Sequence, residues 1–497
     1  MRRKLAISSL TLLFVVAGVW LTAASQNATP KAPPEAPNVA ERIKRVENGL
    51  LPAVLIKGQT LGMKLAERMA HYKVPGLSVA VINDGKIEWA RGYGVFEKDG
   101  SQPVTADTLF LAGSISKPVA ALAALRLVEQ GKLSLDEDVN LKLKTWRVPE
   151  NELTRKQKVT LRRLLSHSAG LTVHGFPGYA ADAPVPTLVQ IFNGEKPANT
   201  GAIRVDIIPG SRWRYSGGGY TVMQQLVMDV TGRSFPEVTR DLVLTPAGMR
   251  QSTYENPLPK MRESEAATAH RANGEKVKGR WHTYPEMAAA GLWTTASDLA
   301  RYAIEVQRAL AGQSKVLSRE MAQQMVTVQM GSSGLGPAME NPGKTSARFG
   351  HGGVDEGFEA NLIAYCQGGQ GAVVMMNANR AMPLASELIR AIAKEYNWPE
   401  YLDAEVVLAK VDPSVYAAYA GQYALGPARN STILVENGRI FLQPAGETKE
   451  ELFPESETTF FPLIQNIRIT FVKDGAGQVT ELVVRQGSEE MKAKKIK

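Results

Sequence analysis

Two groups of strand-like segments enclose a long helical stretch in this sequence. Residues 77–90 read as two strands joined at Asn83-Asp84-Gly85, because an Asp-Gly pair readily adopts the positive φ angles of a hairpin turn. Residues 360–365 and 371–376 are apolar runs typical of buried strands. Helical spacing of apolar residues marks four segments: 118–131, with Gly131 as a C-terminal cap, 220–230, 296–310 and 385–396. We therefore predict an α/β sheet with an inserted helical subdomain.

The C-terminal part of the chain has a different pattern. Short β-type runs at 431–435, 440–442, 467–472 and 480–484 are separated by turn signals such as Asn-Gly and Asp-Gly. This spacing is typical of a small all-β sheet or barrel. With 497 residues, of which 44% are hydrophobic, the chain has room for two cores. We predict a main domain over residues 43–404 and a small all-β domain over residues 405–497.

The N-terminal residues have the layout of an export signal. Residues 1–24 begin with three basic side chains, continue as an apolar run and end in small residues, as in a secretory signal peptide. An apolar run of about 20 residues is also long enough for an uncleaved membrane anchor. Residues 25–42, rich in proline and alanine, are predicted to be a flexible tether. We expect a periplasmic or secreted protein, with anchoring in the inner membrane as the alternative.

Charge and cysteine content exclude several classes of function. The formal net charge is +9, but three basic residues leave with the signal peptide and four lysines lie within residues 492–497, so we expect no nucleic-acid partner. The single cysteine, Cys366, cannot form an internal disulfide and is expected to be a small buried hydrophobe. His167 and His174 lack a third ligand cluster, so we predict no metal site and no cofactor.

Ser114 and Lys117 form the first candidate catalytic pair. They are three residues apart, immediately before the helix predicted from Pro118, and this spacing places both side chains on one face. A serine hydroxyl needs an adjacent base to act as a nucleophile. A lysine becomes such a base when burial lowers its pKa. A lone Ser-x-x-Lys is weak evidence, because residue frequencies alone produce it, and a solvated helix start is the ordinary reading.

Two glycine-rich motifs accompany that pair. Tyr215 lies in Arg214-Tyr-Ser-Gly-Gly-Gly-Tyr220, ahead of a predicted helix, and His351 lies in Phe349-Gly-His-Gly-Gly-Val354, ahead of an apolar strand. Taken together and in this order, Ser114-x-x-Lys117, Tyr215-Ser-Gly217 and His351-Gly-Gly353 resemble the three active-site motifs of the class C β-lactamase-like serine hydrolases. That family includes penicillin-binding carboxypeptidases, esterases and aminopeptidases. The likeness covers about residues 60 to 395, and the tail from Tyr419 resembles a lipocalin-like β domain found in many members.

The resemblance implies a fold, a site and a set of roles. The fold is an antiparallel sheet flanked by helices with an all-helical lobe, followed by the small barrel-like domain. Ser114 would attack a carbonyl group while Lys117 and Tyr215 move protons, and His351 would support Tyr215 and the substrate electrostatically. The backbone amides of Ser114 and Val354 would form the oxyanion hole. The substrate-binding positions of the family motifs fall on Gly217, Gly352 and Gly353 in this chain.

Two departures from the family pattern bear on the substrate. In β-lactamases the second motif normally ends in asparagine, but here it ends in Gly217. The third motif often offers hydroxyls to a substrate carboxylate, whereas this chain has Gly352 and Val354. We therefore predict an exported esterase or peptidase acting on a small-molecule or peptide ester or amide. A β-lactamase or D-alanyl carboxypeptidase proper, and a penicillin-binding or cell-wall sensor without turnover, are the alternatives.

Another kind of hydrolase is a rival interpretation. Ser166-His-Ser168-Ala-Gly170 resembles the nucleophile elbow of an α/β-hydrolase, and residues 350–353 resemble that fold's oxyanion loop. The elbow lacks its first glycine, and the oxyanion loop follows the serine instead of preceding it. Arg212-Trp-Arg214 is expected to pack and form salt bridges, with substrate contact as an alternative.

Overall fold

The computed structural model describes residues 38–497, except residues 60, 425–429, 447–448, 488 and 497. The predicted signal peptide and most of the predicted tether lie outside the described residues. Residues 39–42, assigned to the tether, are instead the first turn of helix α1 (Val39–Glu47), whose Ile43 and Val46 are buried. In the described part of the chain, no helix has both the length and the apolar content needed to cross a membrane.

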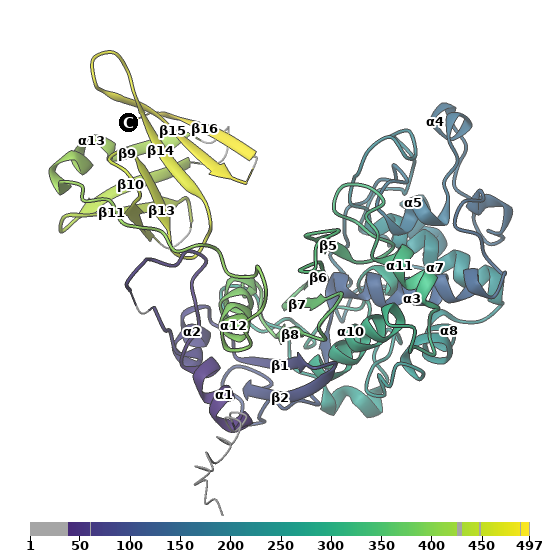
Figure 1. The fold of residues 1–497 in the computed structure, drawn as a ribbon. Helices are drawn as coiled ribbons and strands as arrows, with labels where there is room; N and C mark the ends of the chain where they lie inside the picture. Colours follow the sequence, from purple (N-terminus) through teal and green to yellow (C-terminus); the bar gives the residue numbers. More distant parts are fainter. Residues whose placement is uncertain (1–37, 60, 425–429, 447–448, 488, 497) are drawn as a thin grey trace, which may run out of the picture. The chain divides into compact units, whose positions relative to one another are not determined.

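A six-stranded antiparallel sheet forms the centre of the main body (Figure 1). Its strand order is β2-β1-β8-β7-β6-β5. Strand β1, from the start of the body, therefore pairs with β8, from its end, as predicted for a sheet interrupted by a helical insertion. The strands are β1 (Gly76–Asn83), β2 (Lys86–Gly94), β5 (Ala338–Glu340), β6 (Arg348–Asp355), β7 (Phe358–Tyr365) and β8 (Gly371–Met376). A separate two-stranded pairing joins β3 (Phe110–Leu111) to β4 (Trp293–Thr294).

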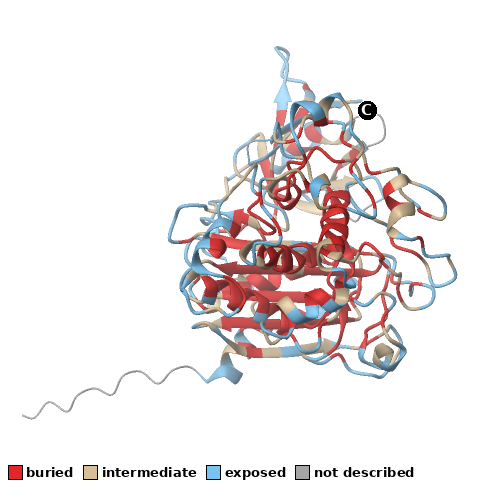
Figure 2. Ribbon diagram, turned by 90° about the vertical axis from the view of Figure 1, so that its right-hand side faces the viewer, coloured by how far each residue is buried: buried red, intermediate tan, exposed pale blue. Residues whose placement is uncertain are grey.

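The central strands β1, β7 and β8 are buried on both faces, and this explains the apolar runs in the sequence. Strand β1 is buried along almost its whole length, with Val79 and Val81 in one core cluster and Ala80 and Ile82 in the other. The buried central strands are visible in Figure 2. The predicted hairpin turn has φ angles of +51° at Asp84 and +69° at Gly85.

Helices cover both faces of the sheet. Helix α10 (Ala296–Leu310) contacts β1, β2, β7 and β8, whereas α12 (Met382–Glu395) contacts β7, β8 and α1, so α10 packs with one core cluster and α12 with the other. The remaining helices of the body are α2 (Leu65–His71), α3 (Ser116–Glu129), α4 (Glu152–Lys156), α5 (Leu161–Leu165), α6 (Leu188–Asn193), α7 (Gly217–Thr231), α8 (Phe235–Thr239), α9 (Met287–Ala290) and α11 (Arg319–Met325). Helices α4 to α8 belong to the insertion between β3 and β4, as the predicted helical lobe requires.

The C-terminal strands close into an eight-stranded barrel with its own core. Its strands are β9 (Gly421–Ala424), β10 (Asn430–Glu436), β11 (Arg439–Pro444), β12 (Glu450–Pro454), β13 (Thr459–Pro462), β14 (Arg468–Lys473), β15 (Val479–Gln486) and β16 (Glu489–Lys495). The four predicted runs correspond to β10, β11, β14 and β15. The short helix α13 (Tyr416–Tyr419) precedes the barrel. The domain boundary near residue 405 stays a prediction.

Candidate active site

Ser114 and Lys117 meet at the start of α3. Ser114 lies in the short 3₁₀ turn η1 (Gly113–Ile115), which continues directly into α3 at Ser116, two residues earlier than predicted. Lys117 Nζ donates hydrogen bonds to Ser114 Oγ at 2.9 Å and to the Ala289 carbonyl oxygen at 2.8 Å. The local spacing of the sequence motif therefore produces a direct contact between nucleophile and amine.

Burial changes the proton affinity of Lys117. The side chain is almost completely buried, and burial lowers the pKa of Lys117 to about 7 because the charged form loses its hydration. The nearby carboxyl group of Asp355 acts in the opposite direction and partly offsets this decrease in the pKa. A substantial fraction of neutral amine is therefore present at pH 7, whereas an ordinary lysine is almost entirely charged at that pH.

Tyr215 joins this pair from the segment before α7. Ser216 caps α7 by accepting a hydrogen bond from the Gly219 amide at 3.0 Å, which fixes the chain directly after Tyr215. Lys117 Nζ lies 4.9 Å from the centroid of the Tyr215 ring. Burial raises the pKa of Tyr215 to about 12, although the nearby Ser114 side chain acts in the opposite direction. The phenol therefore keeps its proton at neutral pH.

His351 reaches the same site from strand β6. Its ring centroid lies 6.1 Å from that of Tyr215, and its Nδ1 lies 2.5 Å from the Gly352 carbonyl oxygen, so Nδ1 carries the proton that it donates there. Burial and the proximity of Lys117 lower the pKa of His351 to about 4. The imidazole is therefore neutral at physiological pH.

Glycines allow β6 to lie against the turn that carries Ser114. A Cβ atom on Gly113, which has a φ of +52°, would lie 2.5 Å from the Val354 nitrogen. A Cβ atom on Gly353 would overlap the carbonyl oxygen of Ala112. Side chains at these positions would push the two segments apart. The segments that carry the Ser114 and Val354 amides, predicted to form the oxyanion hole, are therefore in direct contact.

Gly217 and Gly352, the other two predicted substrate-binding positions, have different surroundings. Gly217 is buried at the start of α7, and a Cβ atom there would lie 3.0 Å from the His174 carbonyl oxygen and 3.0 Å from Phe176 Cε2. Gly352 is exposed, and a Cβ atom there would meet only Met382 Cε, at 3.8 Å. The space for a side chain is therefore closed at Gly217 and open at Gly352.

Two buried carboxyl groups near the site were missed by the sequence analysis. Burial raises the pKa of Asp355 well above its ordinary value, with Lys117 acting in the opposite direction. Burial likewise raises the pKa of Glu286 to about 8. Asp355 lies two residues after the third motif, and that position was its only sequence signal. Nothing in the sequence marked Glu286 or the Ala289 carbonyl that binds Lys117.

The rival nucleophile has no catalytic partner among the described residues. Ser168 Oγ lies 2.9 Å from Ser166 Oγ, which in turn bonds to the Arg162 carbonyl oxygen. The antiparallel sheet also differs from the mostly parallel sheet of an α/β-hydrolase. Cys366 is only half-buried, less than predicted, but it packs against the hydrophobic core. Burial raises the pKa of its thiol to about 11, so the thiol stays protonated at neutral pH.

Trp213 and Arg214, which come directly before Tyr215, both bind neighbouring residues, as expected for the Arg212-Trp-Arg214 segment. Arg214 forms an ion pair with Asp206, and Trp213 Nε1 donates a hydrogen bond to Ser333 Oγ at 2.9 Å. Trp213 nevertheless keeps 42% of its surface exposed, so the alternative of substrate contact stays open.

Comparisons with known proteins agree with this fold. Residues 63–397 match the Beta-lactamase family. The chain is 24% identical to penicillin-binding protein 4* of Bacillus subtilis (strain 168), over 83% of this chain and 93% of that protein. It is 30% identical to esterase EstB of Burkholderia gladioli, over 42% of this chain and 53% of EstB. The fold resembles the octameric penicillin-binding protein homologue from Pyrococcus abyssi, with a TM-score of 0.59, 22% identity and coverage of 86% of this chain and 98% of that one. The chain therefore belongs to the Beta-lactamase family and is a serine hydrolase.

Proposed function

We propose that the protein hydrolyses an ester, amide or peptide bond through an acyl-enzyme on Ser114. The observation that carries this proposal is the 2.9 Å contact between Ser114 Oγ and the buried Lys117 amine. A buried amine with a pKa of about 7 exists partly as the free base at neutral pH and can accept the serine proton. Tyr215 completes the proton-transfer group because it is protonated at neutral pH and its ring centroid lies 4.9 Å from Lys117 Nζ.

The proposed reaction has two halves. Ser114 Oγ bonds to the substrate carbonyl carbon while its proton passes to Lys117 Nζ, and the backbone amides of Ser114 and Val354 donate hydrogen bonds to the carbonyl oxygen as it becomes negative. The bond to the leaving group then breaks, and the leaving oxygen or nitrogen takes a proton from the Lys117–Tyr215 pair. In the second half, water loses a proton to the same pair and attacks the acyl carbon, and Ser114 regains its proton. His351, neutral and beside Tyr215, supports the phenol without adding charge.

The polar anchors of a penicillin-recognising site are replaced in this chain. The position expected to hold an asparagine is Gly217, and the Phe176 ring and the His174 carbonyl occupy the adjacent space. Gly352 and Val354 offer no hydroxyl, and the Val354 side chain is 58% exposed. These features favour ester or peptide hydrolysis over efficient β-lactamase or D-alanyl carboxypeptidase activity.

Replacing Gly217 with asparagine is expected not to create a β-lactamase. Because the new Cβ would lie 3.0 Å from His174 O and Phe176 Cε2, we expect a loss of about 1–3 kcal/mol in the free energy of unfolding and no turnover of a penicillin. Denaturant unfolding and a penicillin hydrolysis assay measure the two effects. Gly201→Asn is the control, since a Cβ at Gly201 has no heavy atom within 4 Å. Wild-type stability together with new penicillin turnover would contradict this prediction.

The pH dependence of acylation follows from the state of Lys117. The neutral amine is the active form and its pKa is about 7, so kcat/KM should rise between about pH 6 and 8 with a midpoint near 7. The pKa of His351 is about 4 and that of Tyr215 is about 12, so neither adds a second limb in this range. Stopped-flow acylation by an activated ester measures the profile. A midpoint near the ordinary lysine value of about 10.4 would mean that burial does not lower the pKa of Lys117 in the free enzyme.

Mass spectrometry tests the proposed function directly. The purified protein is exposed separately to an activated ester, a penicillin and a fluorophosphonate, with Ser114→Ala as the control. We expect an adduct on Ser114 with the ester and the fluorophosphonate, none in the control, and multiple turnover of the ester. Stable stoichiometric acylation by penicillin without release would favour the sensor alternative, and a folded protein that no probe labels would exclude the acyl-enzyme.

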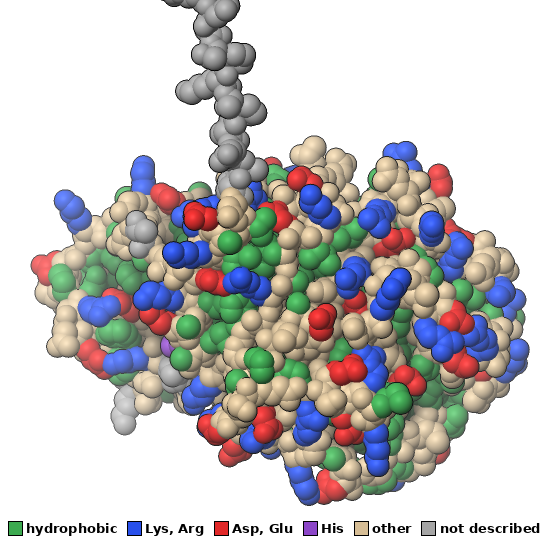
Figure 3. Space-filling view, turned by 90° about the horizontal axis from the view of Figure 1, so that it is seen from below, with side chains coloured by type: hydrophobic (Ala, Val, Ile, Leu, Met, Phe, Trp, Pro, Cys, Tyr) green, Lys and Arg blue, Asp and Glu red, His purple; other side chains and the backbone are tan. Residues whose placement is uncertain are grey.

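We further propose an exported protein whose partner is a small-molecule or peptide substrate. The basic and apolar start of the sequence supports export. Basic and acidic side chains are interspersed on the face shown in Figure 3, which gives no support there to a nucleic-acid surface. Detection of the protein in a periplasmic or culture fraction, with its N-terminus near residue 25, would test export and cleavage together.

A further inference from the structure

His167 binds the backbone on both sides of Tyr215. Its carbonyl oxygen accepts a hydrogen bond from the Arg214 amide at 2.8 Å, and its ring Nδ1 accepts one from the Ser216 amide at 3.2 Å. Among the described residues, the bond to Ser216 is the ring's only hydrogen bond, because Nε2 has no partner. The polar groups of one residue therefore bracket the tyrosine.

The His167 ring also contacts the phenol ring itself. The two ring centroids are 4.2 Å apart with an interplanar angle of 31°, and His167 is only 4% exposed. The ring centroid of Tyr220 lies 5.3 Å from that of His167. The hydroxyl of Tyr220 is itself held in place, because it donates a hydrogen bond to the Leu165 carbonyl oxygen at 2.8 Å. The buried imidazole thus packs against two tyrosine rings and has little freedom to move.

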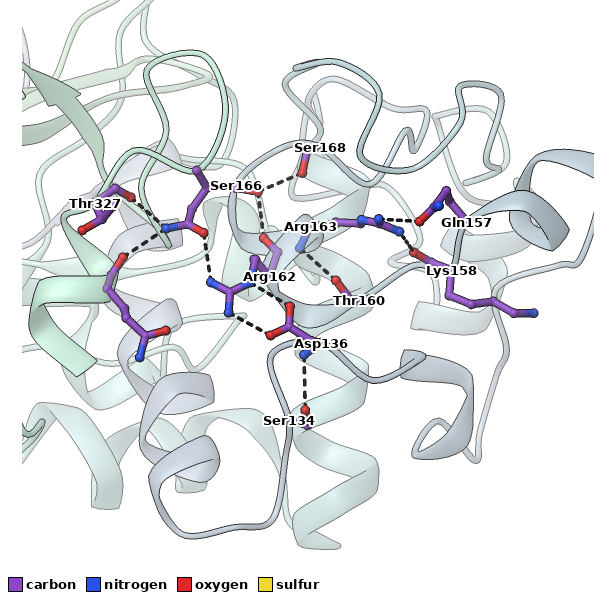
Figure 4. Close-up of polar contacts among 12 residues, drawn as sticks. Ser134, Asp136, Gln157, Lys158, Thr160, Arg162, Arg163, Ser166, Ser168 and Thr327 are labelled. Carbon is purple, nitrogen blue, oxygen red and sulfur yellow. Dashed lines mark hydrogen bonds and ion pairs between the residues drawn. The ribbon is translucent and has the colours of Figure 1, made fainter. Parts of the chain in front are cut away.

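The turn that carries His167 is anchored independently of Tyr215. His167 has a φ of +56°, directly after helix α5. On either side of it, Ser166 and Ser168 share a hydrogen bond, and Ser166 also bonds to the Arg162 carbonyl (Figure 4). The Arg162 guanidinium makes two hydrogen bonds with Asp136, of 2.7 and 2.8 Å. These contacts hold the turn, so a fixed imidazole is presented to the Tyr215 segment.

We propose that His167 is a positioning residue that holds the Tyr215 phenol within reach of Ser114 and Lys117. This inference rests on the proposed function, in which Tyr215 moves protons. Only the neutral imidazole has an unprotonated Nδ1 that can accept a hydrogen bond from the Ser216 amide. Burial, together with Lys117, His351 and His174 nearby, lowers the pKa of His167 well below its ordinary value and keeps that form in place.

A double-mutant cycle tests the inference. We expect His167→Ala to lower the acylation rate by roughly 10- to 100-fold with little change in KM, because the nucleophile and binding surface stay while the phenol moves. His167→Asn should restore most of the rate, since its Oδ1 replaces the Nδ1 acceptor and asparagine tolerates a positive φ. In a Tyr215→Phe background, His167→Ala should have less than about a twofold further effect.

Two outcomes would overturn the inference. An equal loss in the wild-type and Tyr215→Phe backgrounds would mean that His167 acts elsewhere, and a rate for His167→Asn no higher than for His167→Ala would exclude the Ser216 hydrogen bond as its means. Should His167→Ala fail to fold, His167→Leu, which fills the buried space but has no acceptor for the Ser216 amide, takes its place in the cycle with the same expected results. Wild-type activity in Tyr215→Phe alone would instead refute the proposed role of Tyr215, so the two failures are distinguishable.

Discussion

Lys117→Ala is expected to lower kcat/KM for ester hydrolysis by about 10³- to 10⁴-fold, the upper range for loss of a general base. The reason is local: Lys117 Nζ is 2.9 Å from Ser114 Oγ, and burial brings the pKa of Lys117 to about 7. The fold should persist, because the substitution removes a buried amine whose hydration was lost on folding and leaves only two groups without that hydrogen bond, the Ala289 carbonyl and the half-buried Ser114 hydroxyl. Single-turnover acylation and thermal unfolding measure the two effects.

A second lysine on the same part of the chain provides a matched control. Lys132 follows the end of α3 and is exposed, so Lys132→Ala should leave both rate and stability within experimental error. Near-normal acylation by Lys117→Ala at neutral pH would show that another group accepts the Ser114 proton. A rate loss accompanied by unfolding would instead mean that Lys117 is needed for the fold.

The parts of the site that were predictable from sequence are those fixed by local geometry. Ser114 and Lys117 meet because residues three apart at a helix start share a face, and this depends on nothing distant. Tyr215 and His351 come from segments far along the chain, so they were expected beside Ser114 only through the family resemblance. His167 was considered as a metal ligand and rejected, and its contact with Tyr215 depends on how two separate segments pack.

The same difference between local and long-range contacts decides which strands of the fold were predictable from the sequence. Strands β1, β7 and β8 were predicted because burial on both faces requires apolar runs. Strand β16, with the sequence Glu-Glu-Met-Lys-Ala-Lys-Lys, was missed because only Ala493 is buried in it, and it forms through pairing with β15 and β9. Polar strands of a small barrel owe their structure to closure of the barrel, which no single segment encodes.

Gly353→Ala is expected to have the second-largest effect, although no side chain is lost. The added Cβ would overlap the Ala112 carbonyl oxygen and lie 3.0 Å from its carbonyl carbon. Ala112 cannot retreat easily, because its amide is bonded to the Leu292 carbonyl at 2.9 Å, and β6 is held between β5 and β7. Strand β6 must therefore move away from η1 and carry the Val354 amide with it.

That movement separates the two proposed oxyanion donors, and loss of one such donor costs about 10²- to 10³-fold in kcat. We also expect a loss of about 1–3 kcal/mol in the free energy of unfolding from the overpacked contact. Gly201→Ala is the control, since a Cβ there meets no heavy atom within 4 Å. Acylation kinetics and denaturant unfolding separate the two effects. Wild-type kinetics in Gly353→Ala would mean that the Val354 amide does not need its contact with η1, and the oxyanion would then have to be bound by other donors.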